Sequence, residues 1–220
     1  ARCHRRAARR VTPAEAEICE LLEELLDLVE LHPRNNLNLC LLGGMTELLA
    51  LVFSHESAGV RKQACSILTS VMSNKDKLEF ATKSGALNLV LSFEREPSLP
   101  LKDALFGSLA AWVKADNFEG KRRFIQEHAG ASWLGRLFSD PTANQEFPMR
   151  LRKKIILVLH DFVLNDDSIF EEHPFLVRAH YCADQAFLTA LKALFENAEV
   201  TRMDQAFYRQ YALRILFRLH

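Results

Sequence analysis

The sequence predicts an all-α protein, a solenoid of about four three-helix repeats with flanking helices. Glycine and proline are scarce, at 8 and 7 of 220 residues, whereas the many turns of an all-β protein usually need both. Leu, Ala, Glu, Lys and Arg, which are good helix formers, are abundant. One short apolar pattern returns three times along the chain, as expected of stacked repeats.

The first repeated pattern is a glycine followed by an apolar helix face. Gly44, Gly85 and Gly130 align at spacings of 41 and 45 residues. A leucine follows each glycine by four residues and a Val or Phe follows it by eight, so these side chains share one face of a helix. We expect each glycine to separate two helices with a positive φ, a conformation that glycine adopts at little cost.

A second pattern marks a longer helix in each repeat. Segments 60–72, 101–113 and 151–163 carry apolar residues at offsets 0, 4, 5, 8, 11 and 12, and Phe207–Leu219 is similar to the start of another such helix. Each unit is expected to hold a long helix, a short one such as Lys75–Lys83, and a third that starts at the glycine. This order is typical of an armadillo-like or HEAT-like right-handed α-solenoid, and a four-helix bundle would not need it.

The boundary residues predict one solenoid domain behind a basic lead-in. Residues 1–11 form the lead-in, which we expect to be solvated because five arginines and no acid precede the first helix. Residues 12–220 form the domain, with repeats over 12–55, 56–96, 97–140 and 148–198 and a partial repeat over 199–220. Thr12–Glu15 is a capping box with proline at the first helical position. Prolines at 33, 97, 100 and 141 are expected to mark the boundaries between later helices.

The overall charge and the cysteines argue against several classes of protein. With 28 basic and 28 acidic residues the formal net charge is zero, which predicts no nucleic-acid or membrane partner. No apolar run approaches the length of about 18 residues that a membrane-spanning helix needs. Five cysteines without a C-x-x-C motif predict free thiols, with Cys40 and Cys65 buried on apolar helix faces.

Two groups of residues could carry chemistry, and neither has the partners that it needs. His160 and Asp161 would form a base and its orienter, but no nucleophile or oxyanion site accompanies them, so local hydrogen bonds at a helix end are expected. His173, His180 and Cys182 share one connector without a second cluster of donors. We therefore predict no enzymatic activity, no cofactor and no metal.

A solenoid of this type binds partners on the concave face lined by its third helices. Positions three, six or seven, and ten after each aligned glycine are expected to project from that face. Trp133 stands where the sister repeats carry Glu and Asn, so it either forms an exposed binding hot spot or packs under a neighbouring repeat. The predicted partner-binding residues are Glu47, Asn88, Ser92, Arg95, Trp133 and Arg136.

Three segments resemble the armadillo-type nucleotide-exchange factors of heat-shock protein 70 chaperones. LLDLVELHPRNNLNLCLLGGMTELL resembles the family's first repeat, VRKQACSILTSVMSNKDKLEFATKSGALNLVLSF its second and LPLKDALFGSLAAWVKADNFEGKRRFIQEHAG its third. The resemblance covers most of Glu17–Glu172. It implies a co-chaperone that clasps the chaperone's nucleotide-binding domain with its concave face and speeds ADP release without covalent chemistry. We expect a monomer, because a capped solenoid is usually one.

The same resemblance favours one of the family's two branches. The cytosolic branch usually carries a Trp where this sequence has Ser66, Ile67 and Leu68. The fourth segment, RKKIILVLHDFVLNDDSIFEE, is closer to the luminal branch, which serves BiP in the endoplasmic reticulum. The resemblance therefore implies BiP as the partner and the endoplasmic reticulum lumen as the location, with the cytoplasm as the alternative.

Two other functions stay open on the residues alone. An armadillo adaptor that binds an extended peptide predicts a ladder of Asn and Trp at one third-helix position, which Asn88 and Trp133 fit and Glu47 breaks. A nucleic-acid-binding solenoid predicts a continuous basic stripe, but the clusters at Lys121–Arg123 and Arg150–Lys154 are too separated in register to predict one.

Overall fold

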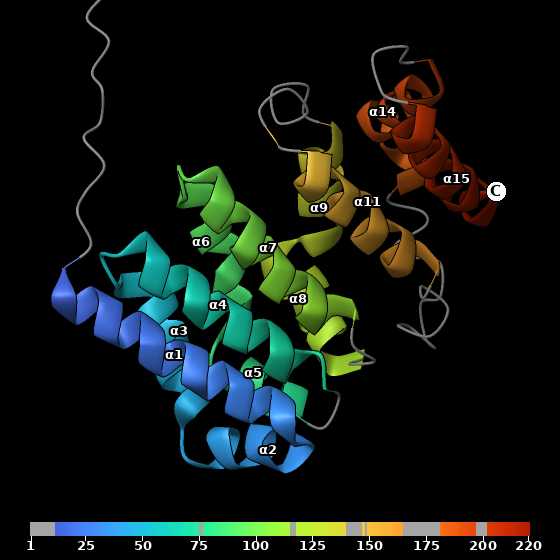
Figure 1. The fold of residues 1–220 in the computed structure, drawn as a ribbon. Coiled ribbons are helices and arrows are strands. Elements are labelled where there is room, and N and C mark those ends of the chain that lie inside the picture. Colours follow the sequence, from blue (N-terminus) through green and yellow to red (C-terminus); the bar gives the residue numbers. More distant parts are fainter. Residues whose placement is uncertain are drawn as a thin grey trace, which may run out of the picture.

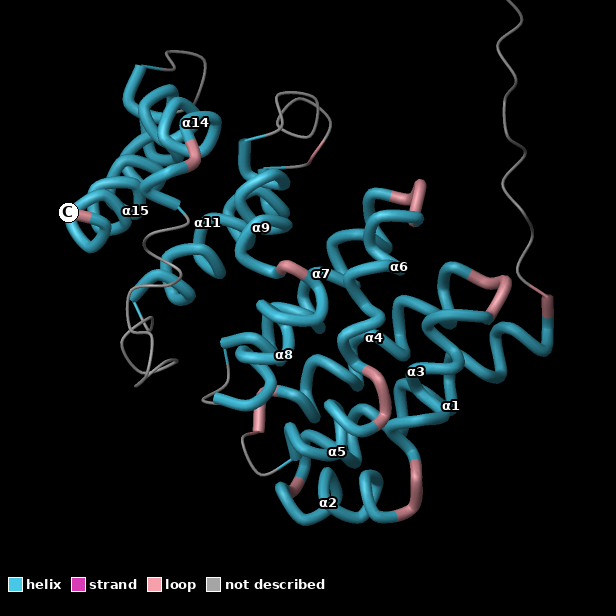
Figure 2. Tube along the Cα trace, turned by 180° about the vertical axis from the view of Figure 1, so that it is seen from behind, coloured by secondary structure: helices cyan, strands magenta, loops and turns pink. Residues whose placement is uncertain are grey.

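The described part of the chain is helical. The computed structural model describes residues 12–74, 77–114, 118–139, 147, 149–164, 181–196 and 202–220, and these contain no strand (Figure 1, Figure 2). No single helix among them is long and apolar enough to cross a bilayer. The one pair that is long and apolar enough when taken together, Pro33–Leu41 with Gly44–Ser54, is bent by 79°. The helices are α1 Pro13–Leu31, α2 Pro33–Leu41, α3 Gly44–Ser54, α4 Ala58–Met72, α5 Leu78–Lys83, η2 Ala86–Asn88, α6 Leu89–Arg95, α7 Leu99–Lys114, α8 Phe118–His128, α9 Gly130–Ser139, α11 Met149–Leu164, α14 Gln185–Glu196 and α15 Arg202–Leu219.

The helices form repeats that stack in sequence order. The first helices of the repeats, α1, α4, α7, α11 and α15, lie side by side across the molecule (Figure 1). Each third helix packs on the first helix of the next repeat, α3 on α4, α6 on α7 and α9 on α11. The predicted right-handed α-solenoid is confirmed, with α1 at one end and α15 at the other. The lead-in at 1–11 and the connectors at 140–146 and 165–180 lie outside the described residues.

The core follows the two periodic patterns of the sequence. Every described residue of both patterns is buried, because the spacing places these side chains on the faces that meet the neighbouring repeats. On the third helices they are Leu48, Val52, Leu89, Phe93, Leu134 and Phe138. On the long helices they are Val60, Ala64, Cys65, Leu68, Val71, Met72, Leu101, Leu105, Phe106, Leu109, Trp112, Val113, Leu151, Ile155, Ile156 and Leu159.

The predicted glycine conformation holds in one repeat and is wrong in two. Gly85 has φ 87°, but in the first and third repeats the positive φ falls one residue earlier, at Gly43 (82°) and Ala129 (47°). Gly44 and Gly130 instead begin α3 and α9. They are needed for space, since a Cβ at position 130 would lie 2.7 Å from Cγ of Phe124. The glycines do mark the boundaries, but two of them permit close packing rather than a left-handed turn.

The beginning of α1 has the predicted cap. The Thr12 hydroxyl oxygen accepts a hydrogen bond from the Glu15 amide at 3.2 Å, and the Glu15 carboxylate accepts one from the Thr12 amide at 2.8 Å. Pro13 and Pro33 occupy the first positions of α1 and α2. Since these prolines lack an amide hydrogen that the helix would leave unpaired, they fix the two helix starts at no loss of hydrogen bonding.

Candidate functional site

Of the six predicted partner-binding residues, Asn88 ends η2 directly before α6 and the others lie on third helices, and five of the six divide between two hollows. One, the α9 hollow, has a volume of about 740 Å³ and includes Trp133 and Arg136. The other, the α6 hollow, has a volume of about 450 Å³ and includes Asn88, Ser92 and Arg95. Helix α6 contributes residues to both hollows. Glu47 is exposed on α3 and lines neither.

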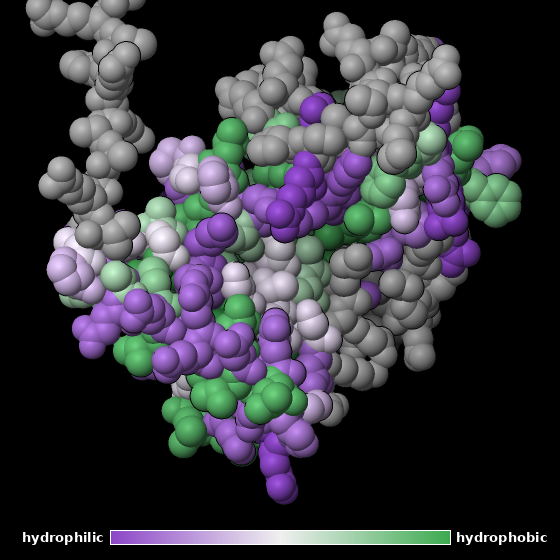
Figure 3. Space-filling view, in the orientation of Figure 1, coloured by the Kyte–Doolittle hydropathy of each residue, from purple (hydrophilic) through white to green (hydrophobic). Residues whose placement is uncertain are grey.

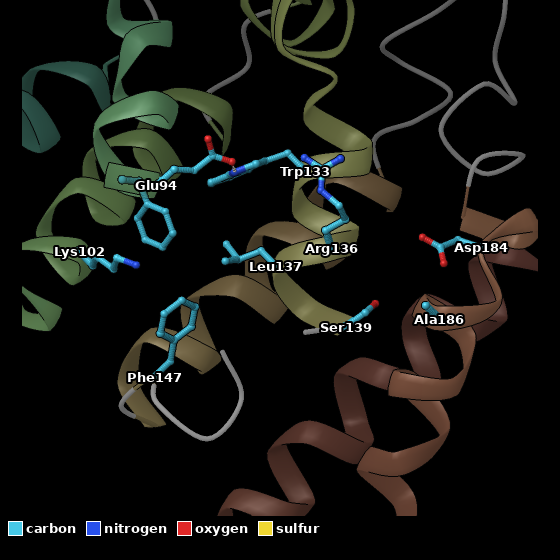
Figure 4. A pocket seen from close by; sticks show the side chains of 10 residues that line it. Glu94, Lys102, Trp133, Arg136, Leu137, Ser139, Phe147, Asp184 and Ala186 are labelled. Carbon is cyan, nitrogen blue, oxygen red and sulfur yellow. Dashed lines mark hydrogen bonds between the residues drawn. The ribbon is translucent and has the colours of Figure 1, made fainter. Parts of the chain in front are cut away.

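Residues from four helices and from two connectors line the α9 hollow (Figure 4). The helices are α6, α7, α9 and α14, and the connector residues are Phe147, which precedes α11, and Asp184, which precedes α14. The lining residues are Phe93, Glu94, Lys102, Trp133, Arg136, Leu137, Ser139, Phe147, Asp184 and Ala186.

Trp133 forms the aromatic floor of the α9 hollow. Its side chain is only 3% exposed, so the prediction of an exposed hot spot is wrong and the packed alternative is confirmed. The indole packs edge-on against Phe93 at 5.6 Å and Phe124 at 6.2 Å, and stacks on Phe106 at 6.3 Å between ring centroids. Its Nε1–H donates to a carboxylate oxygen of Glu94 at 2.9 Å, which satisfies the buried polar group (Figure 4).

Most charges around this floor are already engaged within the chain. The Lys102 ammonium lies 5.2 Å from the Phe93 ring centroid and 5.4 Å from that of Phe147, within cation–π range. Asp184 accepts a hydrogen bond from the Phe187 amide at 3.0 Å and so caps α14, while Glu94 holds Trp133. Arg136 is exposed and has no ion-pair partner in the described part of the chain. The hollow therefore offers a partner an apolar floor and an available positive charge.

A largely buried ion pair forms the base of the α6 hollow. The Arg61 guanidinium lies 2.8 Å from the Glu96 carboxylate, and their side chains are 20% and 5% exposed. Arg61 Nε–H also donates to the Val52 carbonyl at 2.7 Å, and Glu96 accepts from the Ser98 amide at 2.8 Å. These bonds tie the end of α3 to α4 and to the segment that leads into α7. The pair is occupied in holding the repeats together, so a partner here would meet the exposed Arg95 and Asn88 instead.

The lining residues that do not belong to third helices were not predicted from the sequence. Arg61 and Lys102 are not at the positions counted from the aligned glycines, but each directly follows the first apolar position of a long helix. Arg152 occupies the same place in the fourth repeat. That recurring base was the signal that could have identified them. Phe147 and Asp184 lie in connectors, where no periodicity predicts which side chain turns toward the third helices.

The residues considered for catalysis or metal binding do not line either hollow. His160 is 6% exposed on α11, and its Nδ1 lies 3.1 Å from the Asp161 carboxylate, the local hydrogen bond that was predicted. Cys40 and Cys65 are buried free thiols as expected. Within the described ranges no three His, Cys, Asp or Glu side chains could hold a metal ion together. His173 and His180 lie outside those ranges.

Comparison with known proteins places the fold but not the function. No family model and no curated protein match the sequence. The structure is similar to the armadillo-repeats-only protein ARO of Plasmodium falciparum, at 21% identity and a TM-score of 0.68 over 100% of this chain and 86% of that one. The designed armadillo repeat protein YIII(Dq)4CqI gives 16% identity and 0.60, over 95% and 96% of the two chains. Computationally designed armadillo repeat proteins for modular peptide recognition give 15% and 0.57, over 93% and 94%. The chain has an armadillo-type fold.

Proposed function

We propose that this chain is a non-catalytic scaffold that holds a folded domain of a partner protein on its third-helix face. Armadillo-type solenoids generally offer such a concave face to proteins or peptides. The observation that carries the proposal is the irregularity of the face. The equivalent third-helix position holds an exposed acid at Glu47, an exposed amide at Asn88 and a buried indole at Trp133. Gripping an extended main chain residue by residue needs the same polar group in each repeat, so an irregular face suits one particular folded surface better.

The partner we propose is the nucleotide-binding domain of a heat-shock protein 70 chaperone, which the resemblance of the first three repeats implies. The scaffold would bind the opened, nucleotide-poor form of that domain more tightly than the closed, ADP-bound form. ADP release then accelerates because the equilibrium shifts toward the form from which ADP leaves. Equal binding of both forms would shift nothing, however tight the complex.

ADP release from two chaperones tests the proposal. BiP and a cytosolic heat-shock protein 70 are loaded separately with fluorescent ADP and chased with excess ATP, with and without this protein. Acceleration with BiP supports the luminal assignment, and acceleration with the cytosolic chaperone alone moves the proposed location to the cytoplasm. No acceleration of either, with a chain that circular dichroism shows to be helical, contradicts the exchange function.

Charge reversal on the third-helix face makes the test specific to the site. Arg95 and Arg136 are exposed, and neither has an ion-pair partner among the described residues, so reversing both should leave the fold intact. We expect the double variant R95E/R136E to need roughly tenfold more protein for the same acceleration, since rim charges steer association. Arg34→Glu, which reverses another exposed arginine, on α2, is the matched control and should behave as the unmodified chain.

A peptide-binding adaptor is the second candidate, and the α9 hollow favours it. Its floor of Phe93, Trp133 and Phe147 beside the available Arg136 would suit one apolar side chain next to a carboxylate. If this function is the true one, ADP release stays unchanged, while an acidic peptide library screened by fluorescence anisotropy yields ligands that lose affinity on Arg136→Glu.

A further inference from the structure

The outer face of α1, at one end of the solenoid, carries an exposed leucine stripe among acids. Leu21, Leu28 and Leu31 are 59%, 54% and 77% exposed and follow one another by seven and three residues, on a single helix face. The opposite face of α1 packs on α2 and α4. Figure 3 shows hydrophobic side chains among hydrophilic ones at this end, at lower left. The helix has no Lys or Arg, and its acids are Glu15, Glu17, Glu20, Glu23, Glu24, Asp27 and Glu30.

The outer face of α15, at the other end, carries the opposite charge. Leu213 and Phe217 are 57% and 86% exposed, whereas the inner face of the helix packs on α11 and α14. Its four arginines outnumber its one acid, Asp204. Like α1, this end therefore presents apolar side chains within a charged surround, but the surround is basic.

A cleft of about 530 Å³ lies beside these residues of α15. It is lined by His160, Leu213, Arg214, Phe217 and Arg218. His160 projects from α11, is 6% exposed, and leaves its Nε2 buried without a hydrogen-bond partner. A buried polar atom without a hydrogen-bond partner is uncommon in folded proteins. The apolar side chains, the two arginines and the His160 Nε2 atom together form a site that suits a group both apolar and acidic.

We propose that the α15 cleft binds the acidic leucine face of α1 from a second copy of this chain. Within the molecule each first helix already packs on the first helix of the next repeat, so α15 against a second α1 continues the same row. Leucines would meet Leu213 and Phe217, and the α1 carboxylates would surround the arginines. Pairing α1 with α1, or α15 with α15, would bring like charges together and is disfavoured.

This contact joins two different surfaces, so it is a head-to-tail contact that leaves one α1 and one α15 available in each pair and allows further copies to add. It does not use the third-helix face, and it stands independently of the exchange function. It also differs from the monomer that the sequence analysis expects.

Sedimentation velocity of the chain over a wide concentration range tests the contact. We expect the average mass to rise with concentration and to fall as salt is raised, because the interface is charge-complementary and partly exposed. Glu24→Arg on α1 and Arg214→Glu on α15 should each weaken association at least tenfold. Arg95→Glu, an exposed arginine on α6, is the matched control and should leave association unchanged.

Mixing the two variants gives the decisive measurement. In the mixture the unmodified α1 of the R214E chain can meet the unmodified α15 of the E24R chain, and the two reversed surfaces also attract each other, so the mixture should associate more strongly than either variant alone. A chain that stays monomeric at every concentration overturns the proposal. So does a mixture no more associated than its components, with circular dichroism showing both variants folded. Association abolished by R214E but unaffected by E24R would instead indicate that α15 pairs with itself or with another segment.

Discussion

Ala129 and Gly130 are neighbours for which opposite substitutions should have opposite effects on stability. Ala129 has φ 47°, where its Cβ crowds the backbone, and such a conformation costs a non-glycine residue about 1–2 kcal/mol. Gly130 begins α9, and a Cβ there would lie 2.7 Å from Cγ of Phe124. Phe124 cannot easily move aside, because it is fully buried and packs edge-on against Trp112 at 6.4 Å and Trp133 at 6.2 Å.

Both magnitudes follow from this geometry. Gly130→Ala overpacks a rigid aromatic cluster, so we expect a loss of about 3 kcal/mol, the upper end for one added methyl group. Ala129→Gly removes the left-handed strain but gives the unfolded chain more freedom, worth about 0.4–1 kcal/mol, so a net gain of about 0.5 kcal/mol remains. Near Tm, 1 kcal/mol corresponds to about 2–4 °C in a domain of this size, so the two variants should differ clearly.

Urea unfolding followed by tryptophan fluorescence measures this pair directly. The chain's two tryptophans, Trp112 and Trp133, both belong to the third repeat and report the region that the substitutions change. Local reporting matters because stacked repeats need not unfold together. A G130A variant as stable as the unmodified chain would show that α8 and α9 are farther apart than described. An A129G variant less stable than the unmodified chain would show that residue 129 does not occupy the left-handed region.

Three further results are expected. Glu96→Ala should lower the free energy of unfolding by about 3 kcal/mol in urea titrations, because Arg61 is left mostly buried without its partner, and a smaller loss than about 1 kcal/mol would contradict the ion pair. Burial raises the pKa of the Cys65 thiol to about 12, so a maleimide at pH 8 should label the exposed Cys182 quickly and Cys65 only after unfolding, as peptide mass spectrometry would show. Tyr181→Phe removes the buried hydrogen bond that the tyrosine hydroxyl donates to the Ala131 carbonyl at 3.0 Å, and should cost about 1 kcal/mol by thermal melting.

The core was predictable because burial in a solenoid repeats with the helix. Leu89 and Phe106 each occupy a position whose equivalents are buried in the sister repeats, so a single rule assigns them. The left-handed residue was not predictable in the same way. Both Gly43 and Gly44 can adopt a positive φ, and the choice depends on which of them must approach Leu39 closely.

The candidate site was predictable only where it lies on one helix. Counting from the glycine selected Arg95 and Arg136, which are exposed, but also Trp133, whose side chain fills a space between Phe93 and Phe124 that no count along α9 describes. Lys102 reaches the α9 hollow from α7, another helix of the same repeat, and Phe93 reaches it from the preceding repeat. Such contacts depend on how repeats are stacked, and stacking is set by side-chain volumes across two helices rather than by the period of either.

The third-helix face and the two end faces depend on different charged residues, so their functions can be separated experimentally. Arg95 and Arg136 lie on α6 and α9, whereas Glu24 and Arg214 lie on the outer faces of α1 and α15. If a folded partner binds the third helices, R95E/R136E should impair ADP exchange while self-association continues, and R214E should do the reverse. If instead the partner needs a single copy of the solenoid, self-association would compete with it, and R214E would increase exchange at high protein concentration. The dependence of exchange on protein concentration therefore distinguishes two independent surfaces from surfaces that oppose each other.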